Sequence, residues 1–187
     1  MTRMSATRIL MAAALMAGTA LAGAQNSFPT PPTDDELAKQ ARHVVLQYPY
    51  YYIFDQVNLF VHDGQVQLSG AVTEPFKKSD LGRLVRRIPG VASVSNEIRV
   101  LPPSPVDESL RRQVARAIFS YGDLARYAAG PVPTMHILVE NGRVTLFGVV
   151  ATEADKQLAG LRANGAGLSF GPIVNNLEVE NPYAGRS

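Results

Sequence analysis

The side chains that carry most enzyme and metal chemistry are scarce in this sequence. Its 187 residues include no cysteine, which excludes thiolate catalysis, disulfide bonds and cysteine-bound metal ions. The three histidines, His43, His62 and His136, show no i, i+4 pair of the kind that holds zinc on a helix. We interpret them as ordinary surface side chains. The sequence therefore predicts no metal site and no cofactor.

The sequence also offers no complete signature of nucleophilic or phosphate chemistry. One serine, Ser169, lies in a Gly-x-Ser-x-Gly sequence (167–171), but this sequence follows a predicted helix and no strand leads into it, so it does not match a nucleophile elbow. The glycine-rich stretch 163–167 follows no strand and precedes no Lys-Ser or Lys-Thr pair, so it does not match a phosphate-binding loop. The acids fall mainly at expected helix starts and turns, where capping explains them. We predict a protein without catalytic residues, and a metal-dependent hydrolase is the least favoured alternative.

A group of basic residues forms the first candidate binding site. Three of them lie opposite the apolar stripe of one predicted helix, so they would form its outer face. Such a face favours an anionic phospholipid surface, at about 1 kcal/mol per basic residue near the membrane. A solvated helix face is the alternative. The candidate lipid-binding residues are Lys77, Lys78, Arg83, Arg86 and Arg87.

A run of tyrosines, Tyr50, Tyr51 and Tyr52, forms the second candidate site. Tyrosine combines an apolar ring with a polar tip, which suits an interface with lipid or protein. Packing of these rings in the core or in a loop is the alternative.

The N-terminal residues resemble a secretory signal. Arg3 and Arg8 precede a short apolar run, and an Ala-x-Ala pattern ends at Ala24. The run is shorter than the roughly 20 residues of a membrane span. We therefore predict a cleaved signal peptide, a periplasmic or secreted protein and no transmembrane span in the mature chain; an uncleaved anchor is the alternative.

Removal of this segment also changes the charge of the protein. The whole chain carries 18 basic and 16 acidic residues, and its net charge is +2. Without Arg3 and Arg8, 16 basic residues face 16 acids. The mature chain is therefore near neutral, which argues against a nucleic-acid partner.

The elements that must position these residues occur twice. The segments 57–72 and 135–150 align with an offset of 78 residues, and 96–100 aligns with 175–179 at 79. Each copy contains a hairpin signal, Asp63-Gly64 or Asn141-Gly142, between alternating apolar positions. Gly64 and Gly142 are expected to allow the turn.

Two further glycines recur at the same offset. Gly70 and Gly148 each follow the turn glycine of their copy by six residues, on the return strand of the hairpin. We expect both to let a helix pack closely on the sheet.

Helices are predicted before and after each hairpin. The clearest apolar stripe contains Leu81, Leu84, Val85 and Ile88, and Pro89-Gly90 ends that helix. The last helix of the second copy is the weakest, because Leu158 and Leu161 are its only large apolar residues. Each copy is thus predicted to have the order helix, strand, strand, helix, strand.

These patterns give a complete domain division. A signal peptide (1–24) and a disordered linker (25–32) precede the first domain (33–101). A Pro-rich linker (102–105) leads to the second domain (106–180), and a disordered tail (181–187) ends the chain.

The repeated unit resembles the BON family. The resemblance rests on the hairpin pattern at Leu59–Val72 and on the segment Gly90–Val100, which the second copy repeats in part. It implies an α+β fold with two tandem αββαβ sandwiches, each a three-stranded mixed sheet covered on one face by two helices. It further implies a non-enzymatic cell-envelope module that binds phospholipid or envelope proteins, in an osmotic-stress or chaperone-like role.

Overall fold

We describe the protein from a computed structural model, which covers residues 31–120, 122–130, 132–166 and 171–180. The predicted signal peptide, residues 25–30 of the predicted linker and the tail 181–187 lie outside these residues.

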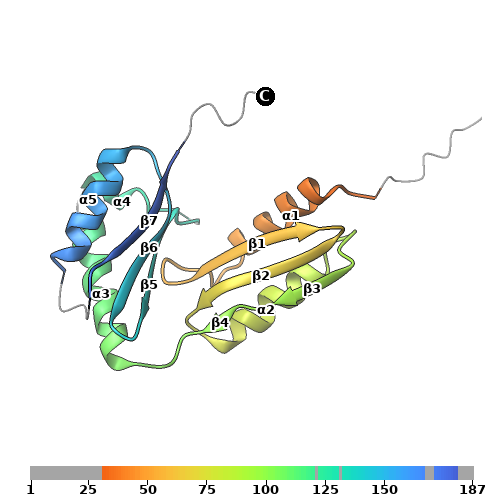
Figure 1. Ribbon diagram of the computed structural model, residues 1–187, viewed down its shortest axis with the longest axis horizontal. Coiled ribbons are helices and arrows are strands. Elements are labelled where there is room, and N and C mark those ends of the chain that lie inside the picture. The colour runs from red at the N-terminus through yellow and green to blue at the C-terminus, as the bar shows by residue number, and fades with distance from the viewer. Residues whose placement is uncertain (1–30, 121, 131, 167–170, 181–187) are drawn as a thin grey trace, which may run out of the picture. The chain divides into compact units, whose positions relative to one another are not determined.

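The first module contains two helices and one sheet (Figure 1). The central strand β2 pairs antiparallel with β1 and parallel with both β3 and β4. Its elements are α1 (Asp34–Leu46), β1 (Gln56–His62), β2 (Gln65–Val72), α2 (Pro75–Arg86), β3 (Ser93–Asn96) and β4 (Arg99–Val100).

The second module repeats this plan and adds a short helix. Strand β6 is central, with β5 antiparallel on one side and β7 parallel on the other. Its elements are α3 (Pro105–Phe119), α4 (Gly122–Ala125), β5 (Met135–Glu140), β6 (Arg143–Val150), α5 (Glu153–Asn164) and β7 (Val174–Val179).

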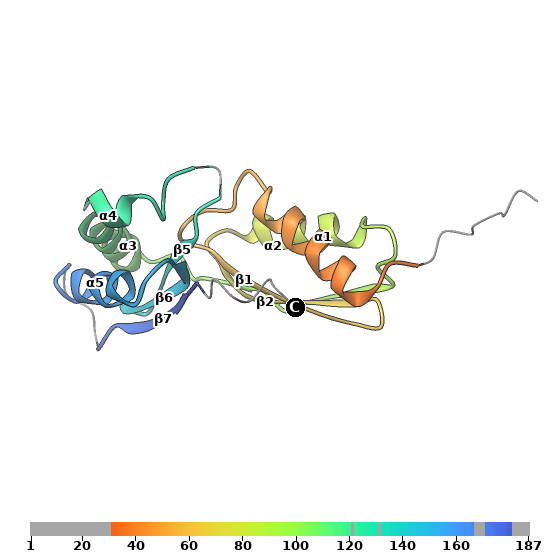
Figure 2. The same cartoon turned by 90° about the horizontal axis from the view of Figure 1, so that it is seen from above.

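The predicted α+β fold with two tandem modules is confirmed. In the first module, α1 and α2 lie on the same face of the sheet (Figure 2). Leu37 of α1 and Leu81 of α2 bury against Leu68 of β2, while Ile137 and Leu146 occupy the second core. The first sheet has a fourth strand because the parallel pairing with β2 is interrupted between Asn96 and Arg99.

The two hairpin turns have the backbone that their sequences suggest. Asp63 and Gly64 have φ values of 49° and 72°, and Asn141 and Gly142 have 53° and 73°. Positive φ at both central positions defines a type I′ turn, whose twist matches that of the flanking strands.

The second pair of shared glycines has a different role from the one expected. Gly70 and Gly148 have φ values of 110° and 116°, a region that side chains rarely adopt. A Cβ atom on Gly70 would collide with the carbonyl oxygen of Gln56 on the neighbouring strand, and one on Gly148 with that of Thr134. These glycines therefore accommodate the adjacent strand rather than a helix.

Close approach of helix to sheet occurs instead at Gly82 and Gly160. The Asn96 amide donates to the Lys78 carbonyl of α2 at 2.7 Å, across the space that a Cβ on Gly82 would fill. Asn175 donates in the same way to the Lys156 carbonyl beside Gly160, at 2.8 Å. One glycine–asparagine contact thus joins the second long helix of each module to its last strands.

Helix α5 is better formed than its sequence suggests. It has 12 residues, as α2 does, and the Thr152 side chain accepts from the Asp155 N–H at its start. Ala159 and Ala163 are its buried apolar residues, whereas Leu161 is exposed. The expectation that Leu161 anchors this helix is therefore wrong. The helix packs through Ala159 and Ala163, whose small side chains let it lie close to the sheet.

Candidate functional site

Helix α2 carries most of the candidate lipid-binding residues, and its sequence explains why it forms. Pro75 occupies its first turn, where the missing N–H costs no hydrogen bond. Leu81 and Val85 are buried under it, and Arg83 and Arg86 lie in its last turn, where cations favour the helix dipole.

The three arginines at the end of α2 are on the surface. Arg83, Arg86 and Arg87 are all exposed. Arg83 forms an ion pair of 2.6 Å with Asp80, one turn earlier. The hydroxyl of Tyr48, in the loop that follows α1, also donates to Asp80 at 2.7 Å. Burial and this hydrogen bond both raise the pKa of Tyr48. Asp80 therefore offsets the charge of Arg83 and leaves the charges of Arg86 and Arg87 on this surface.

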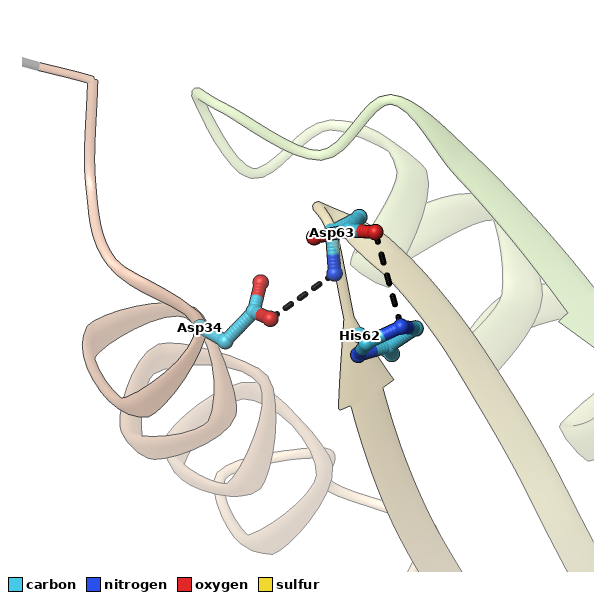
Figure 3. A group of neighbouring side chains, drawn as sticks. All are labelled: Asp34, His62 and Asp63. Atoms are coloured by element: carbon cyan, nitrogen blue, oxygen red, sulfur yellow. Dashed lines mark hydrogen bonds and ion pairs between the residues drawn. The ribbon is translucent and has the colours of Figure 1, made fainter.

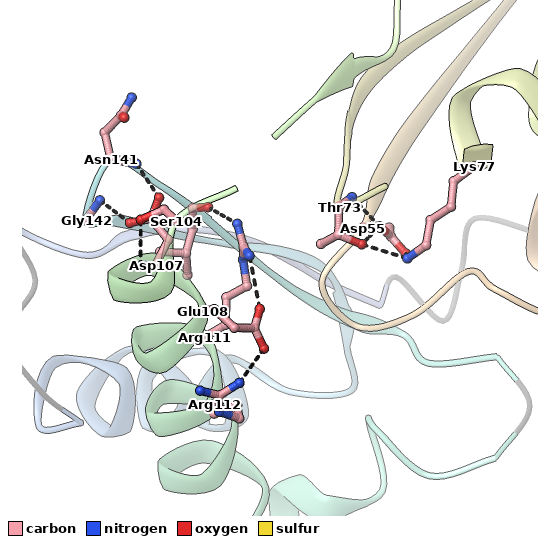
Figure 4. A network of polar contacts seen from close by, with 11 residues as sticks. Asp55, Thr73, Lys77, Ser104, Asp107, Glu108, Arg111, Arg112, Asn141 and Gly142 are labelled. Atoms are coloured by element: carbon pink, nitrogen blue, oxygen red, sulfur yellow. Dashed lines mark hydrogen bonds and ion pairs between the residues drawn. The ribbon is translucent and has the colours of Figure 1, made fainter. Parts of the chain in front are cut away.

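Lys77 does not belong to this surface. Its side chain is buried, and its ammonium group donates to Asp55 and to the Thr73 hydroxyl, both at 2.7 Å (Figure 4). It also lies 5.1 Å from the centre of the Tyr52 ring. The prediction that Lys77 binds lipid is wrong, because the residue faces the loop before β1. Lys78 is half-buried.

The tyrosine run is divided between surface and core. Tyr50 and Tyr52 are 50% and 52% exposed, but Tyr51 is only 6% exposed. The Tyr51 hydroxyl accepts from the Val57 N–H, its ring lies 5.1 Å from that of His136, and burial raises its pKa to about 12. Tyr51 is therefore a packing residue, which corrects its prediction as an interface residue.

Phe76 completes the surface aromatic group, and sequence reasoning missed it. It is 46% exposed and makes an edge-on contact of 5.5 Å with Tyr50. Arg83 and Arg87 follow Phe76 by seven and eleven positions, which places all three on one helix face. This spacing could have indicated Phe76. We call Tyr50, Phe76, Arg83, Arg86 and Arg87 the outer face of α2.

Among its described residues the second module has no equivalent of this face, and the ion pair at its second long helix has reversed charges. Asp155 occupies the position of Lys77, 78 residues later. It accepts from Arg126 and from the Tyr127 hydroxyl, both at 2.9 Å. Hydrogen bonding from Thr152, then from Tyr127 and Arg126, lowers the pKa of Asp155. The helix supplies the cation in the first module and the anion in the second.

An aspartate at the start of the first helix of each module caps the hairpin turn. Asp34 accepts from the N–H groups of Asp63 and Gly64, at 2.8 and 2.9 Å. Asp107 accepts from Asn141 and Gly142, at 2.9 and 2.7 Å (Figure 4).

One ligand atom from each of Asp34, His62 and Asp63 lies within 4.8 Å of the other two, a spacing that could hold a metal ion (Figure 3). The turn bonds already account for the position of Asp34, and they lower its pKa. They recur at Asp107, where Glu140 and Asn141 replace His62 and Asp63. We therefore assign this group to turn capping.

His136 is also not the surface residue that its sequence position suggests. It is buried beside Tyr51, and its Nδ1 atom lies 3.3 Å from the Tyr52 carbonyl oxygen. Burial lowers the pKa of His136 below 6.5, which favours a neutral ring.

Comparison with known proteins gives the family. A model of the BON domain matches residues 33–102 and 107–181. In the described part of the chain, no helix is both long and apolar enough to cross a membrane. No curated protein matches the chain.

Two similar solved structures come from CdsD of Chlamydia trachomatis, described as a structural protein of the Type III secretion system. The first is 19% identical with a TM-score of 0.31, over 77% of this chain and 61% of that one. The second, its C-terminal domain, is 18% identical with a TM-score of 0.31, over 80% and 67%. This chain therefore spans less than two thirds of the first structure. Because the family model covers most of the sequence, the chain belongs to the BON-domain family and carries two tandem copies of the domain.

Proposed function

We propose that this protein is a non-enzymatic envelope module that attaches to anionic phospholipid surfaces through the outer face of α2. The observation that carries the proposal is the position of Arg83 and Arg87 on the same helix face as the exposed Phe76. Cations next to aromatic rings suit the boundary between headgroups and acyl chains, since the rings bury while the cations meet phosphate.

The expected attraction is moderate and depends on salt. Three arginines near an anionic surface contribute about 3 kcal/mol in total, which corresponds to roughly 150-fold in affinity. Asp80 lies 2.6 Å from Arg83 and reduces this contribution. Because the Debye length falls from about 10 Å at 0.1 M salt to about 3 Å at 1 M, high salt should release the protein.

Liposome co-sedimentation tests the proposal. The purified chain should pellet with phosphatidylglycerol vesicles and remain in solution with phosphatidylcholine vesicles. The Arg83/Arg86/Arg87→Glu variant should lose this selectivity. All variants share the same N-terminal residues, so a difference between them reports on α2.

A matched control reverses three exposed arginines of the second module, Arg112, Arg116 and Arg143. This variant has the same net charge as the α2 variant and should still pellet. Equal losses in both variants would mean that total charge, rather than the outer face of α2, drives binding. Unchanged pelleting of the α2 variant would contradict the proposal directly.

A protein-binding or chaperone-like role is the second candidate, supported by the exposed rings of Tyr50 and Tyr52. Suppression of client aggregation, lost in a Tyr50/Tyr52→Ser variant, would favour it. We place either role in the periplasm, on the basis of the signal-like residues 1–24. A periplasmic protein whose N-terminus is Gln25 would support export, and a cytosolic protein that retains residues 1–24 would contradict it.

A further inference from the structure

The face of the first sheet that lies opposite α1 and α2 is a second candidate surface (Figure 2). Strand residues alternate, so Val57, Leu59 and Val61 face the helices while their neighbours face away. We call the opposite set the amide face: Asn58, Phe60 and His62 on β1, Gln65, Gln67 and Ser69 on β2, and Ser93 and Ser95 on β3.

The pairing of the strands arranges this face in rows. Phe60 pairs with Gln67, which pairs with Ser95. His62, Gln65 and Ser93 form the next row, and Asn58 and Ser69 form the row on the other side. Neighbouring strands are about 4.8 Å apart, and successive rows along a strand are about 7 Å apart. The result is a regular array of hydrogen-bonding groups.

The array itself is an uncharged polar surface, bordered by the exposed Glu97, which accepts from the Ser95 hydroxyl at 3.1 Å. None of the residues of the array is Asp, Glu, Lys or Arg. Each amide offers a donor and an acceptor together, and each serine hydroxyl can act as either. Phe60 is 64% exposed in the middle row, and its ring stacks beside that of His62 at 6.5 Å. One exposed ring among neutral donors and acceptors matches a partner with hydroxyl groups and apolar C–H faces.

The fold does not require these residue types. At an offset of 78, the second module carries Leu138 in place of Phe60, Thr145 in place of Gln67 and Phe147 in place of Ser69. Val174 of β7 pairs with Thr145 where Ser95 pairs with Gln67. Arg143 and Glu140, which replace Gln65 and His62, add charges. The neutral array is therefore a property of the first module alone.

We infer that the amide face binds an uncharged glycan. Its amides and serines would hydrogen-bond sugar hydroxyl and acetamido groups, and Phe60 would stack on the C–H face of one sugar ring. Charge complementarity favours this partner, because the eight residues include no lysine or arginine to pair with an anionic lipid or acidic peptide. The neighbouring Arg99 is already paired with Glu140 at 2.6 Å, and the exposed Glu97 carboxylate would repel an anion. An apolar peptide would find only one large apolar side chain. The inference does not depend on the lipid proposal, which concerns residues on the opposite side of the module.

NMR titration of the isotope-labelled chain with chitohexaose and cellohexaose, two neutral oligosaccharides, tests the inference. Peaks of β1, β2 and β3, including the side-chain amides of Asn58 and Gln67, should shift. Phe60→Ala should weaken binding about tenfold or more, as expected for the central aromatic residue of an interface. Gln67→Thr should also weaken it; the fold tolerates threonine there, since Thr145 occupies the same position in the second module.

Phe76→Ala is the matched control, because it removes an exposed phenylalanine from α2. It should leave glycan binding unchanged. Absence of shifts with both oligosaccharides, or equal losses in Phe60→Ala and Phe76→Ala, would overturn the inference.

The two proposed surfaces can fail separately. Phe60→Ala should still pellet with anionic vesicles, and Arg83/Arg86/Arg87→Glu should still bind glycan. Loss of glycan binding in the arginine variant, if the variant is folded, would overturn the amide-face inference and leave the lipid proposal in place.

Discussion

Replacing Lys77 by methionine should destabilise the first module and leave lipid binding unchanged. Among the described residues, the Lys77 ammonium group is the only cation that forms an ion pair with the Asp55 carboxylate. Asp55 is fully buried. Methionine keeps most of the length and apolar contact of the lysine chain, so the substitution removes chiefly the charge and its two hydrogen bonds.

The expected loss is about 3 kcal/mol. Removing one partner of a buried ion pair costs about 3 to 5 kcal/mol, because the remaining charge is left uncompensated. Asp55 keeps three donors, the Tyr52 and Thr73 N–H groups and the Thr73 hydroxyl, at 2.9 to 3.0 Å. These bonds place the cost at the lower end of the range. For a module of this size, about 3 kcal/mol corresponds to roughly 12 to 24 °C in melting temperature.

Urea unfolding followed by amide peaks measures this loss. Val66 reports on the first core and Val144 on the second. Lys78→Met is the matched control, since Lys78 is the half-buried neighbour on the same helix, and it should change stability by less than about 0.5 kcal/mol. If both variants lose the same stability, or if Lys77→Met abolishes vesicle binding while folded, Lys77 is not a buried structural cation.

Two further predictions concern the backbone and the turn. Gly148→Ala should cost at least about 2 kcal/mol of unfolding free energy in urea, because φ is positive and the Cβ would displace the Thr134 carbonyl; Gly122→Ala, with open space around it, should cost less than about 0.5 kcal/mol. The pKa of Asp34 is lower in the folded state, chiefly through the Gly64 N–H, so its stabilising effect is present above pH 3.8 and is lost as the pH falls through the folded pKa. Asp34→Asn should therefore unfold with a weaker acid dependence in that interval, and an acid profile identical to that of the parent chain would contradict the assignment.

Local sequence patterns predict the fold well because its signals are local and repeated. The Asp63-Gly64 turn fixes the β1–β2 register, and the copy at Asn141-Gly142 fixes that of β5 and β6. The helix stripe around Leu81 needs only the 3.6-residue period. These features arise within a few residues of one another, so one sequence is enough to find them.

The site is predicted less well because it depends on contacts between distant residues. Lys77 resembles the other basic residues until Asp55, 22 residues earlier, is placed beside it. Tyr51 resembles its neighbours until the loop turns its ring towards His136. Phe76 becomes a candidate interface residue only through its contact with Tyr50. Residue type alone does not distinguish a buried charge from an exposed one.

The reversed polarity of the Lys77–Asp55 and Asp155–Arg126 ion pairs affects how the chain finds its native pairing during folding. Tandem copies of one fold can exchange equivalent segments and trap misassembled states. If α5 occupied the place of α2, Asp155 would meet Asp55, and α2 in the place of α5 would set Lys77 against Arg126. The first exchange would bring two carboxylates together in a buried site, at a cost of several kcal/mol. The second would cost less, because the Arg126 side chain is 55% exposed and solvent screens its charge. The buried Asp55 therefore disfavours α5 in the first module, a selectivity that two identical copies would lack.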